Sequence, residues 1–195
     1  MRALAWLYRL ILLAAAVVLA LLWLRGPVPP QPTDTPAPPK GHVAIPAPGP
    51  RTPPLTEAID RILVEKAARR LTVFRAGKPV RSYQAALGSQ PLGAKRVQGD
   101  GKTPEGIYRI DRRNPASSYY LSLGVSYPQA ADRKRAAALG HPPGGDIFIH
   151  GQPNELQDGL MLKGDWTAGC IALTNAEIEE LWRITPAGTE IEILP

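Results

Sequence analysis

Two residues in the carboxyl-terminal third of the chain have side chains suited to nucleophilic catalysis. His150 ends an apolar run and is followed by Gly151, and Cys170, the only cysteine of the chain, lies twenty positions further on. A cysteine attacks through its thiolate, so it needs a neighbouring base or a positive environment that lowers its pKa from about 8.5. The pair predicts a thiol enzyme in which Cys170 is the nucleophile and His150 the general base.

The residues around this pair favour a catalytic role for Cys170 and His150 over a purely structural one. Thr167-Ala168-Gly169 is a turn of small residues before Cys170, and Thr174 and Glu177 form a capping box that predicts a helix start shortly afterwards. A small-residue turn entering a helix brings backbone N–H groups to one point, as an oxyanion hole requires. The alternatives are a cysteine buried as a small apolar residue and a histidine with a structural role only.

A nucleotide site is not predicted. Gly99-Asp100-Gly101-Lys102-Thr103 is similar to the end of a phosphate-binding loop, but Arg96 stands where that pattern needs glycine. Pro104 opposes the helix that would have to follow.

No metal site or other cofactor is predicted either, because the metal-binding spacings of histidine are missing. A metal site could be built only from residues that form no motif together: His141, His150, Cys170, and Asp146 or Asp165.

The charge distribution argues against a nucleic-acid partner. The chain carries a formal net charge of +6, but residues 1–54 hold five basic side chains and one acidic one, which account for +4 of it. The remaining +2 is spread over residues 55–195. A nucleic-acid-binding domain would concentrate its basic side chains on one face.

The amino-terminal segment predicts attachment to a membrane. Residues 3–24 contain 22 residues with Arg9 as their only charge, and about 20 apolar residues span a bilayer. A cleaved signal peptide is the alternative for residues 1–25, but no small-residue cleavage pattern closes the run. Arg2 and Arg9 favour a cytoplasmic amino end, which places the rest of the chain outside the cytoplasm. A single cysteine then allows no intrachain disulfide, so its thiol is free.

A proline-rich linker, residues 26–55, predicts a stiff tether. Between Pro27 and Pro54, twelve of 28 residues are proline, and such a segment cannot bury enough apolar surface to fold. Proline-rich chains extend by about 3.1 Å per residue. The domain proper is therefore expected at residues 56–195.

That domain is expected to be mainly β with minor helices, arranged as a sandwich. Strands are predicted over residues 61–64, 70–75, 80–87, 107–110, 119–123, 147–150 and 190–194, with a turn at residues 76–79. A glycine-rich loop is predicted over 88–106, and helices over 129–139 and from Thr174 to Pro186.

With these motifs in hand, the chain resembles the L,D-transpeptidase catalytic-domain family (YkuD-type) of bacterial cell-wall enzymes. Three pieces carry the resemblance: Ile149-His150-Gly151, the run Thr167-Ala168-Gly169-Cys170-Ile171, and Gly101–Tyr108, which is similar to the threonine-proline-x-glycine start of a family strand. The resemblance covers about residues 58–195 and implies a β-sandwich domain. It also implies peptidoglycan stem peptides as partners, and an inner-membrane protein with its catalytic domain in the periplasm.

The resemblance also implies roles for residues. Cys170 would attack the carbonyl of the third residue of a stem peptide, His150 would move the proton, and the Gly151 carbonyl would orient His150. The N–H groups of Gly169 and Cys170 would hold the oxyanion. Thr167 would contact substrate. Trp166 would be either a platform for substrate or a packing residue of the domain. Lys102 and Arg96 would either meet stem carboxylates or remain solvated charges of the loop. Residues 152–166 are expected to form a lid or groove wall.

Two departures from the family pattern leave the reaction open. Ala168 stands where a histidine is frequent, and Ala172 stands where arginine or asparagine is frequent. Both resemble a branch of the family with hydrolytic members. Three functions are therefore considered: an L,D-transpeptidase, a cysteine hydrolase (amidase or carboxypeptidase) acting on the same stem, and a wall-binding module without catalysis.

Overall fold

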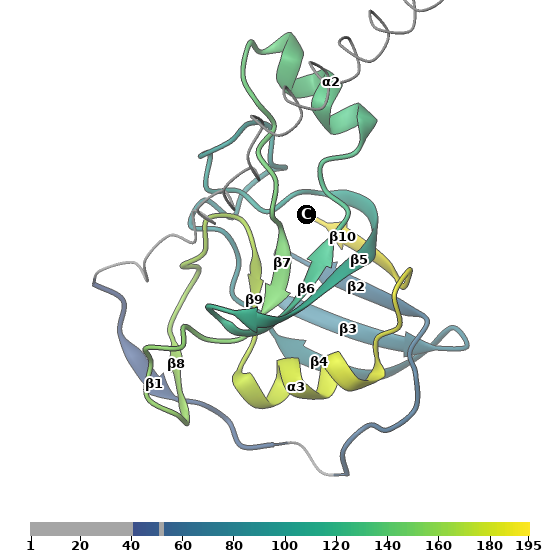
Figure 1. The fold of residues 1–195 in the computed structure, drawn as a ribbon, viewed down its shortest axis with the longest axis vertical. Helices are drawn as coiled ribbons and strands as arrows, with labels where there is room; N and C mark the ends of the chain where they lie inside the picture. The colour runs from purple at the N-terminus through teal and green to yellow at the C-terminus, as the bar shows by residue number, and fades with distance from the viewer. Residues whose placement is uncertain (1–40, 51–52) are drawn as a thin grey trace, which may run out of the picture. The chain divides into compact units, whose positions relative to one another are not determined.

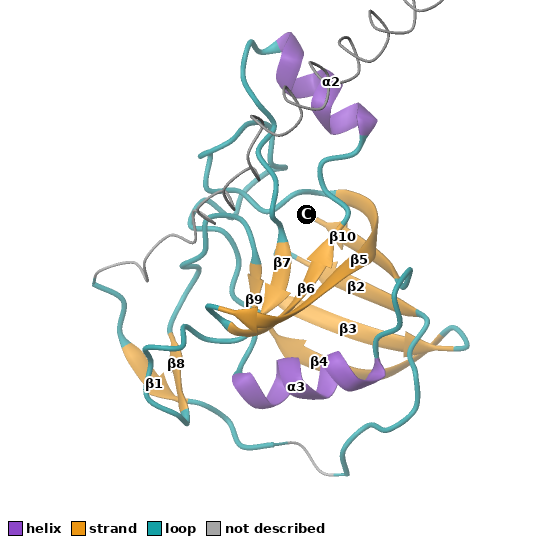
Figure 2. Cartoon of the chain, in the orientation of Figure 1, coloured by secondary structure: helices purple, strands orange, loops and turns teal. Residues whose placement is uncertain are grey.

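Ten strands and two helices form in residues 41–50 and 53–195, the part of the chain that the computed structural model describes (Figures 1 and 2). The strands are β1 (Ala44–Pro46), β2 (Arg61–Glu65), β3 (Arg70–Arg75), β4 (Lys78–Gln84), β5 (Gly106–Ser117), β6 (Tyr120–Val125), β7 (Phe148–His150), β8 (Leu160–Leu162), β9 (Ile171–Ala172) and β10 (Glu190–Leu194). The helices are α2 (Ala130–Ala138) and α3 (Asn175–Ile184).

Eight of these strands form one sheet in the order β4-β3-β2-β10-β5-β6-β7-β9. The long strand β5 belongs to both halves of the sheet, pairing with β10 on one side and with β6 on the other. Its register shifts between Ile110 and Arg112 and again between Asn114 and Ser117, and such bulges increase the local twist. Beyond β4, Ala86 bridges to Ala172 of β9, so the sheet curls until its two edges touch.

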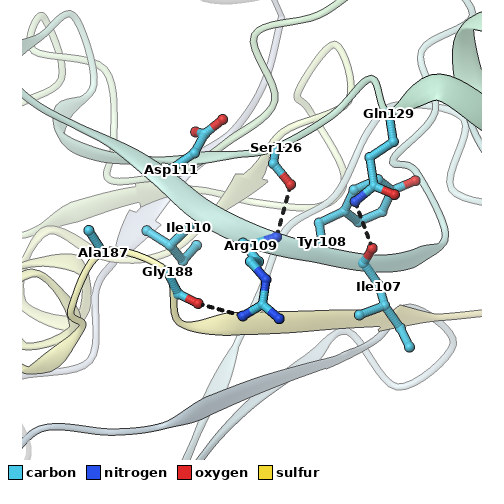
Figure 3. Close-up of a pocket in the computed structure, with 9 residues that line it drawn as sticks. All are labelled: Ile107, Tyr108, Arg109, Ile110, Asp111, Ser126, Gln129, Ala187 and Gly188. Atoms are coloured by element: carbon cyan, nitrogen blue, oxygen red, sulfur yellow. Dashed lines mark hydrogen bonds between the residues drawn. The ribbon is translucent and has the colours of Figure 1, made fainter.

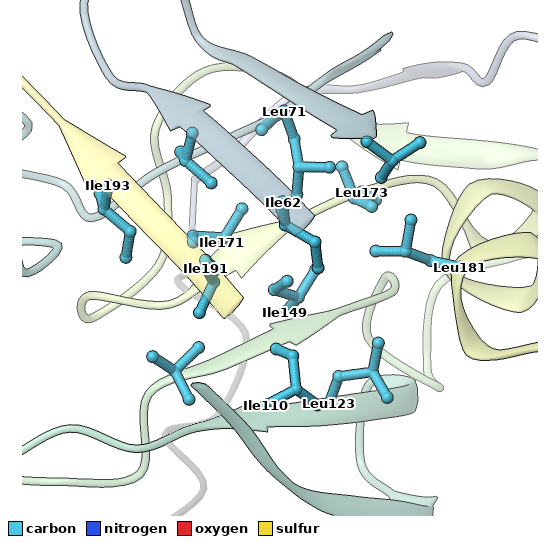
Figure 4. Close-up of a cluster of buried hydrophobic side chains, with 14 of the residues drawn as sticks. Ile62, Leu71, Ile110, Leu123, Ile149, Ile171, Leu173, Leu181, Ile191 and Ile193 are labelled. Atoms are coloured by element: carbon cyan, nitrogen blue, oxygen red, sulfur yellow. The ribbon is translucent and has the colours of Figure 1, made fainter. Parts of the chain in front are cut away.

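The fold is therefore mainly β with few helices, as predicted, and its two halves are parts of a single curled sheet. The core lies inside the curl (Figure 4). Ile62 and Val64 of β2 alternate with partly exposed neighbours, the period of two expected of a half-buried strand. From the other half, Leu123, Ile149 and Ile171 are fully buried in the same cluster.

Both predicted helices are present. In α3, Thr174 accepts a hydrogen bond from the N–H of Glu177, and the Glu177 carboxylate accepts one from the N–H of Thr174. This is the predicted capping box. Ile178 and Leu181 of α3 are fully buried in the core, and α3 lies against β6 and β7. The helix thus covers the core side of the strands that carry the candidate site.

One strand lies within the predicted tether. β1 pairs antiparallel with β8, with Ala44 opposite Leu162 and Pro46 opposite Leu160. The backbone of Leu55 also donates to Glu180 of α3. The carboxyl-terminal part of the proline-rich segment is thus attached to the domain rather than extended away from it.

The predicted membrane segment, residues 3–24, lies outside the described residues. Within residues 41–50 and 53–195, neither helix has the length and apolarity needed to span a bilayer.

Candidate active site

The register of β7 and β9 brings His150 and Cys170 to the same face of the sheet. The two strands are parallel, with Ile149 opposite Ile171 and His150 opposite Ala172. Ile149 and Ile171 point into the core. Because side chains alternate between faces along a strand, His150 and Cys170 both project from the opposite face.

The imidazole of His150 is held by the next peptide group. Its Nδ1 lies 2.7 Å from the carbonyl oxygen of Gly151. A carbonyl only accepts hydrogen bonds, so Nδ1 carries the proton and Nε2 presents its lone pair. A side chain at position 151 would have its Cβ 2.6 Å from Asn175 Oδ1 and 3.0 Å from Tyr120 Cβ, which explains the glycine there.

Aromatic rings enclose His150. The Tyr119 ring lies 4.5 Å from the imidazole between centroids, and the Trp166 ring lies 5.6 Å away, edge to face. Only 3% of His150 is exposed. This burial lowers the pKa of His150 to about 4, despite a smaller opposing effect of the hydrogen bond with Gly151. The histidine is therefore a neutral base at neutral pH.

Cys170 is partly buried. Its thiol donates a hydrogen bond to the carbonyl oxygen of Asp146 at 3.4 Å. Burial raises the pKa of the Cys170 thiol to about 11, against smaller lowering effects of a Phe148 backbone hydrogen bond and the Lys95 charge. At neutral pH the thiol of Cys170 and the imidazole of His150 are thus both uncharged, rather than a thiolate and an imidazolium.

Thr167 fixes the turn before Cys170. Its hydroxyl donates to the carbonyl oxygen of Cys170 at 2.7 Å and accepts from the N–H of Gly169 at 3.1 Å. Thr167 is 5% exposed, and both of its hydrogen bonds support the turn. The Gly169 N–H, one of the two groups expected to hold the oxyanion, therefore already has an acceptor at rest.

The element after Cys170 also differs from the prediction. Cys170 leads into strand β9, and α3 begins only at Asn175. The helix begins at the predicted capping box, but a short strand that the sequence analysis did not expect separates it from the turn. The N–H groups near the sulfur are oriented by the edge of a sheet and by Thr167, not by a helix start.

Gly169 is the tightest point of this turn. Its φ of +142° is disfavoured for other residues, and a Cβ there would lie 2.6 Å from the carbonyl oxygen of Lys102. We expect Gly169→Ala to lower the free energy of unfolding by about 2 kcal/mol and to reduce turnover by displacing Cys170. Urea unfolding and a thiol-labelling rate measured on the same protein test this. Ala168→Gly, a change at an exposed neighbour, is the control, and equal behaviour of the two variants would contradict it.

A family profile, the L,D-transpeptidase catalytic domain called YkuD, matches residues 59–193. The chain belongs to this family. Among curated relatives, YafK of Escherichia coli (strain K12), provisionally assigned as an L,D-transpeptidase, is 34% identical over 105 residues, which are 52% of this chain and 35% of YafK. The chain thus matches about a third of that relative's length.

The solved structures similar to this YkuD domain include the helical cell shape determining protein Pgp2 from Campylobacter jejuni. That structure has a TM-score of 0.55 and 26% identity, and the match covers 70% of this chain and 48% of Pgp2. Bd1075 of Bdellovibrio bacteriovorus matches with a TM-score of 0.49 and 25% identity, over 78% of this chain and 54% of that one.

The remaining residues predicted to contact substrate lie in different surroundings. Trp166 is 4% exposed and packs against Tyr119 and His150. The hydrogen bonds of the described residues leave its indole N–H without an acceptor. Lys102 contributes its backbone, which lies against Gly169. Arg96 is exposed, and its N–H donates to Asp100.

The glycine-rich loop of this YkuD domain is held by buried charges. Asp100 accepts hydrogen bonds from Lys95 Nζ at 2.8 Å and from the backbone of Arg96, Val97 and Lys102. Burial alone would raise the pKa of Asp100, but these hydrogen bonds outweigh it and lower the pKa. The loop that faces Gly169 is therefore a fixed wall of the site.

Another hollow, at β5, is not the candidate site. The pocket in Figure 3 is lined by nine residues and contains neither Cys170 nor His150: Ile107, Tyr108, Arg109, Ile110, Asp111, Ser126, Gln129, Ala187 and Gly188. Among the described residues, no group of three or more histidine, cysteine and acidic side chains is arranged to hold a metal ion.

Tyr119 is the site residue that the sequence analysis did not find. It lies between β5 and β6, where its ring covers His150. Burial, together with the nearby Cys170, raises the pKa of the Tyr119 hydroxyl. No motif marks it, because the β5–β6 turn reaches His150 only through the pairing of β6 with β7.

Proposed function

We propose that the protein is a peptidoglycan L,D-transpeptidase that uses Cys170 as its nucleophile. One observation carries this proposal: His150 and Cys170 project from the same face of paired strands, with Nδ1 of His150 bonded to the Gly151 carbonyl. Family membership supports the substrate class. The peptidoglycan stem peptide is the acyl donor in this proposal.

In the proposed first step, Nε2 of His150 takes the thiol proton as Sγ attacks the carbonyl carbon of the third stem residue. The C–N bond to the terminal D-alanine then breaks, and His150 gives the proton to the leaving nitrogen. A thioester between Cys170 and the stem remains. The neutral resting pair means that charge develops only during the attack, so bound substrate must help to stabilise it.

The N–H of Cys170 is the proposed first donor to the oxyanion. Gly169 joins it only if its N–H leaves Thr167 Oγ1, a hydrogen bond of 3.1 Å at rest. In this proposal Thr167 holds the turn, and Trp166 supports His150 rather than binding substrate.

A second step resolves the thioester. An amine of a neighbouring stem would give a cross-link, and water would give hydrolysis. Ala168 is exposed where many relatives carry a histidine, and this missing side chain favours the hydrolase as the second candidate function. An amidase or carboxypeptidase of this kind would use the same Cys170 and His150.

For location, we propose that residues 3–24 anchor the chain in the inner membrane with the domain in the periplasm. The apolar run and the proline-rich segment support this. Digestion of spheroplasts with a protease is the test, and protection of the domain would contradict the proposal.

Product analysis separates the two reactions. The full chain is incubated with purified stem tetrapeptides, and the products are identified by mass spectrometry, with Cys170→Ala as control. We expect directly linked stem dimers and released D-alanine, both absent with the variant. Release of D-alanine without dimers would assign the hydrolase instead. If Cys170 is unreactive and no product forms, the result would favour the wall-binding module without catalysis.

A further inference from the structure

An arginine lies in the same row of residues as the nucleophile. Arg112 of β5 is opposite Gly124 of β6, and Gly124 is opposite Phe148 of β7. The parallel register of β7 and β9, extended by one residue from Ile149 and Ile171, puts Cys170 next to Phe148. The four strands β5, β6, β7 and β9 are neighbours in the sheet (Figure 1).

The Arg112 side chain runs along this row towards Cys170. Its guanidinium carbon is 4.9 Å from the centroid of the Phe148 ring. Neighbouring strands are about 4.8 Å apart, so the guanidinium reaches the strand next to the one that Cys170 leads into. Asp146 connects the two residues: its carbonyl accepts from the Cys170 thiol at 3.4 Å, and its carboxylate lies 3.8 Å from Arg112 Nη1.

Gly124 provides the path for this side chain. A Cβ at position 124 would lie 2.7 Å from Arg112 Nε and 2.9 Å from Arg112 Cβ. Any larger residue would therefore push the guanidinium away from Phe148. The glycine and the aromatic ring together fix the position of the cation.

The hydrogen-bonding capacity of Arg112 is largely unused. In the described part of the chain it donates no hydrogen bond, and its ion pairs with Asp111 and Asp146 are long, at 3.4 and 3.8 Å. By contrast, Arg70 donates two hydrogen bonds to Glu65, at 2.7 and 2.8 Å. Because 46% of the Arg112 side chain is exposed, such ion pairs contribute little. A planar guanidinium with unused donors is suited to bind a carboxylate through two hydrogen bonds.

We propose that Arg112 is a specificity-determining residue that binds a substrate carboxylate close to the scissile bond. The inference rests on the proposed function, because that function supplies such substrates. Two groups qualify: the terminal carboxylate of the leaving D-alanine, separated from the leaving nitrogen by one carbon, and the side-chain carboxylate of the diamino acid. Binding either group orients the carbonyl carbon towards Sγ.

The test compares three tetrapeptide stems: the free acid, the D-alanine carboxamide and the diamino-acid carboxamide. kcat/KM for loss of the terminal residue is measured with the full chain. We expect one carboxamide to be poorer than the free acid by about tenfold or more, the effect of losing a charged hydrogen bond. Arg112→Gln and Gly124→Ala should remove that preference by lowering kcat/KM for the free acid. Arg112→Lys, which keeps the charge, should retain part of it.

Arg183→Gln is the matched control, since Arg183 is an exposed arginine on α3, and it should keep the full preference. Wild-type activity without any preference, or a preference that persists in Arg112→Gln, would overturn the proposal.

The same peptides are also titrated against Cys170→Ala and Cys170→Ala/Arg112→Gln. A binding preference present in the first and lost in the second supports Arg112 even without turnover, and equal affinities in both overturn it. Absence of Cys170-dependent turnover counts only against the proposed function.

Discussion

Cys170→Ser and His150→Ala are each expected to reduce turnover at least about a thousandfold, because each removes a chemical step of the proposed mechanism. A serine hydroxyl is a much weaker nucleophile at the same position, since its ionised form is far less accessible to a neutral imidazole. His150→Ala takes from the aromatic enclosure of Tyr119 and Trp166 the imidazole that accepts the thiol proton in the proposed mechanism. Release of D-alanine from a stem tetrapeptide measures the effect.

The folded state should survive Cys170→Ser. Cys170 is only partly buried, and the change keeps the size of the side chain nearly constant, so the free energy of unfolding should change by no more than about 1 kcal/mol. Thermal unfolding of wild type and variant gives this control. Normal turnover in the serine variant would reject Cys170 as the nucleophile, and a large loss of stability would mean that Cys170 is a core residue.

The double variant adds a sharper test of the mechanism. If thiol and imidazole act in one step, Cys170→Ser combined with His150→Ala should be little worse than either change alone. Multiplication of the two effects would mean that the residues act independently, contrary to their arrangement at the end of β7 and directly before the adjacent strand β9.

The sequence predicts β2, β3 and β10 well because their apolar residues alternate locally. β3 and β10 have the predicted bounds, and β2 is one residue longer than predicted. The second half of β5 escapes prediction because residues 111–116 are exposed. It is a strand through its backbone pairing with β6, which leaves no pattern in the side chains.

Pairing between distant segments explains the other omissions. β1 is an Ala-Ile-Pro segment in a proline-rich stretch, and it becomes a strand only because β8, far away in the sequence, lies beside it. β9 has two residues, too few for any periodicity. These elements depend on tertiary contacts that no local window contains.

The residues of the candidate site also divide into those that a local stretch of sequence reveals and those that depend on tertiary pairing. His150, Gly151 and Cys170 can be recognised from the sequence because they lie in short motifs with a known spacing. Tyr119 reaches His150 through the β5–β6 hairpin, and the proposed role of Arg112 depends on the same hairpin, so both depend on strand register. The Gly169 N–H was assigned to the oxyanion from the resemblance, but a hydroxyl two residues earlier in the chain accepts it.

Acid is expected to destabilise the protein through His150. Its pKa is lowered from 6.5 to about 4 in the folded state, so between these pH values the unfolded chain binds a proton that the folded chain does not. Stability contributed by the neutral histidine is therefore complete above about pH 6.5 and is lost as the pH falls towards 4. A shift of this size corresponds to about 3 kcal/mol.

Urea unfolding at several pH values between 7 and 4 measures this loss, with His150→Gln as the comparison, since glutamine does not titrate. Carboxylates such as Asp100 and Glu180, whose pKa values are lowered by hydrogen bonds that outweigh burial, titrate in both proteins. The difference between the two curves therefore isolates His150. Parallel curves would contradict a buried neutral imidazole. A steeper loss in wild type would establish that the base is kept uncharged by its enclosure, the condition under which it can accept the thiol proton at neutral pH.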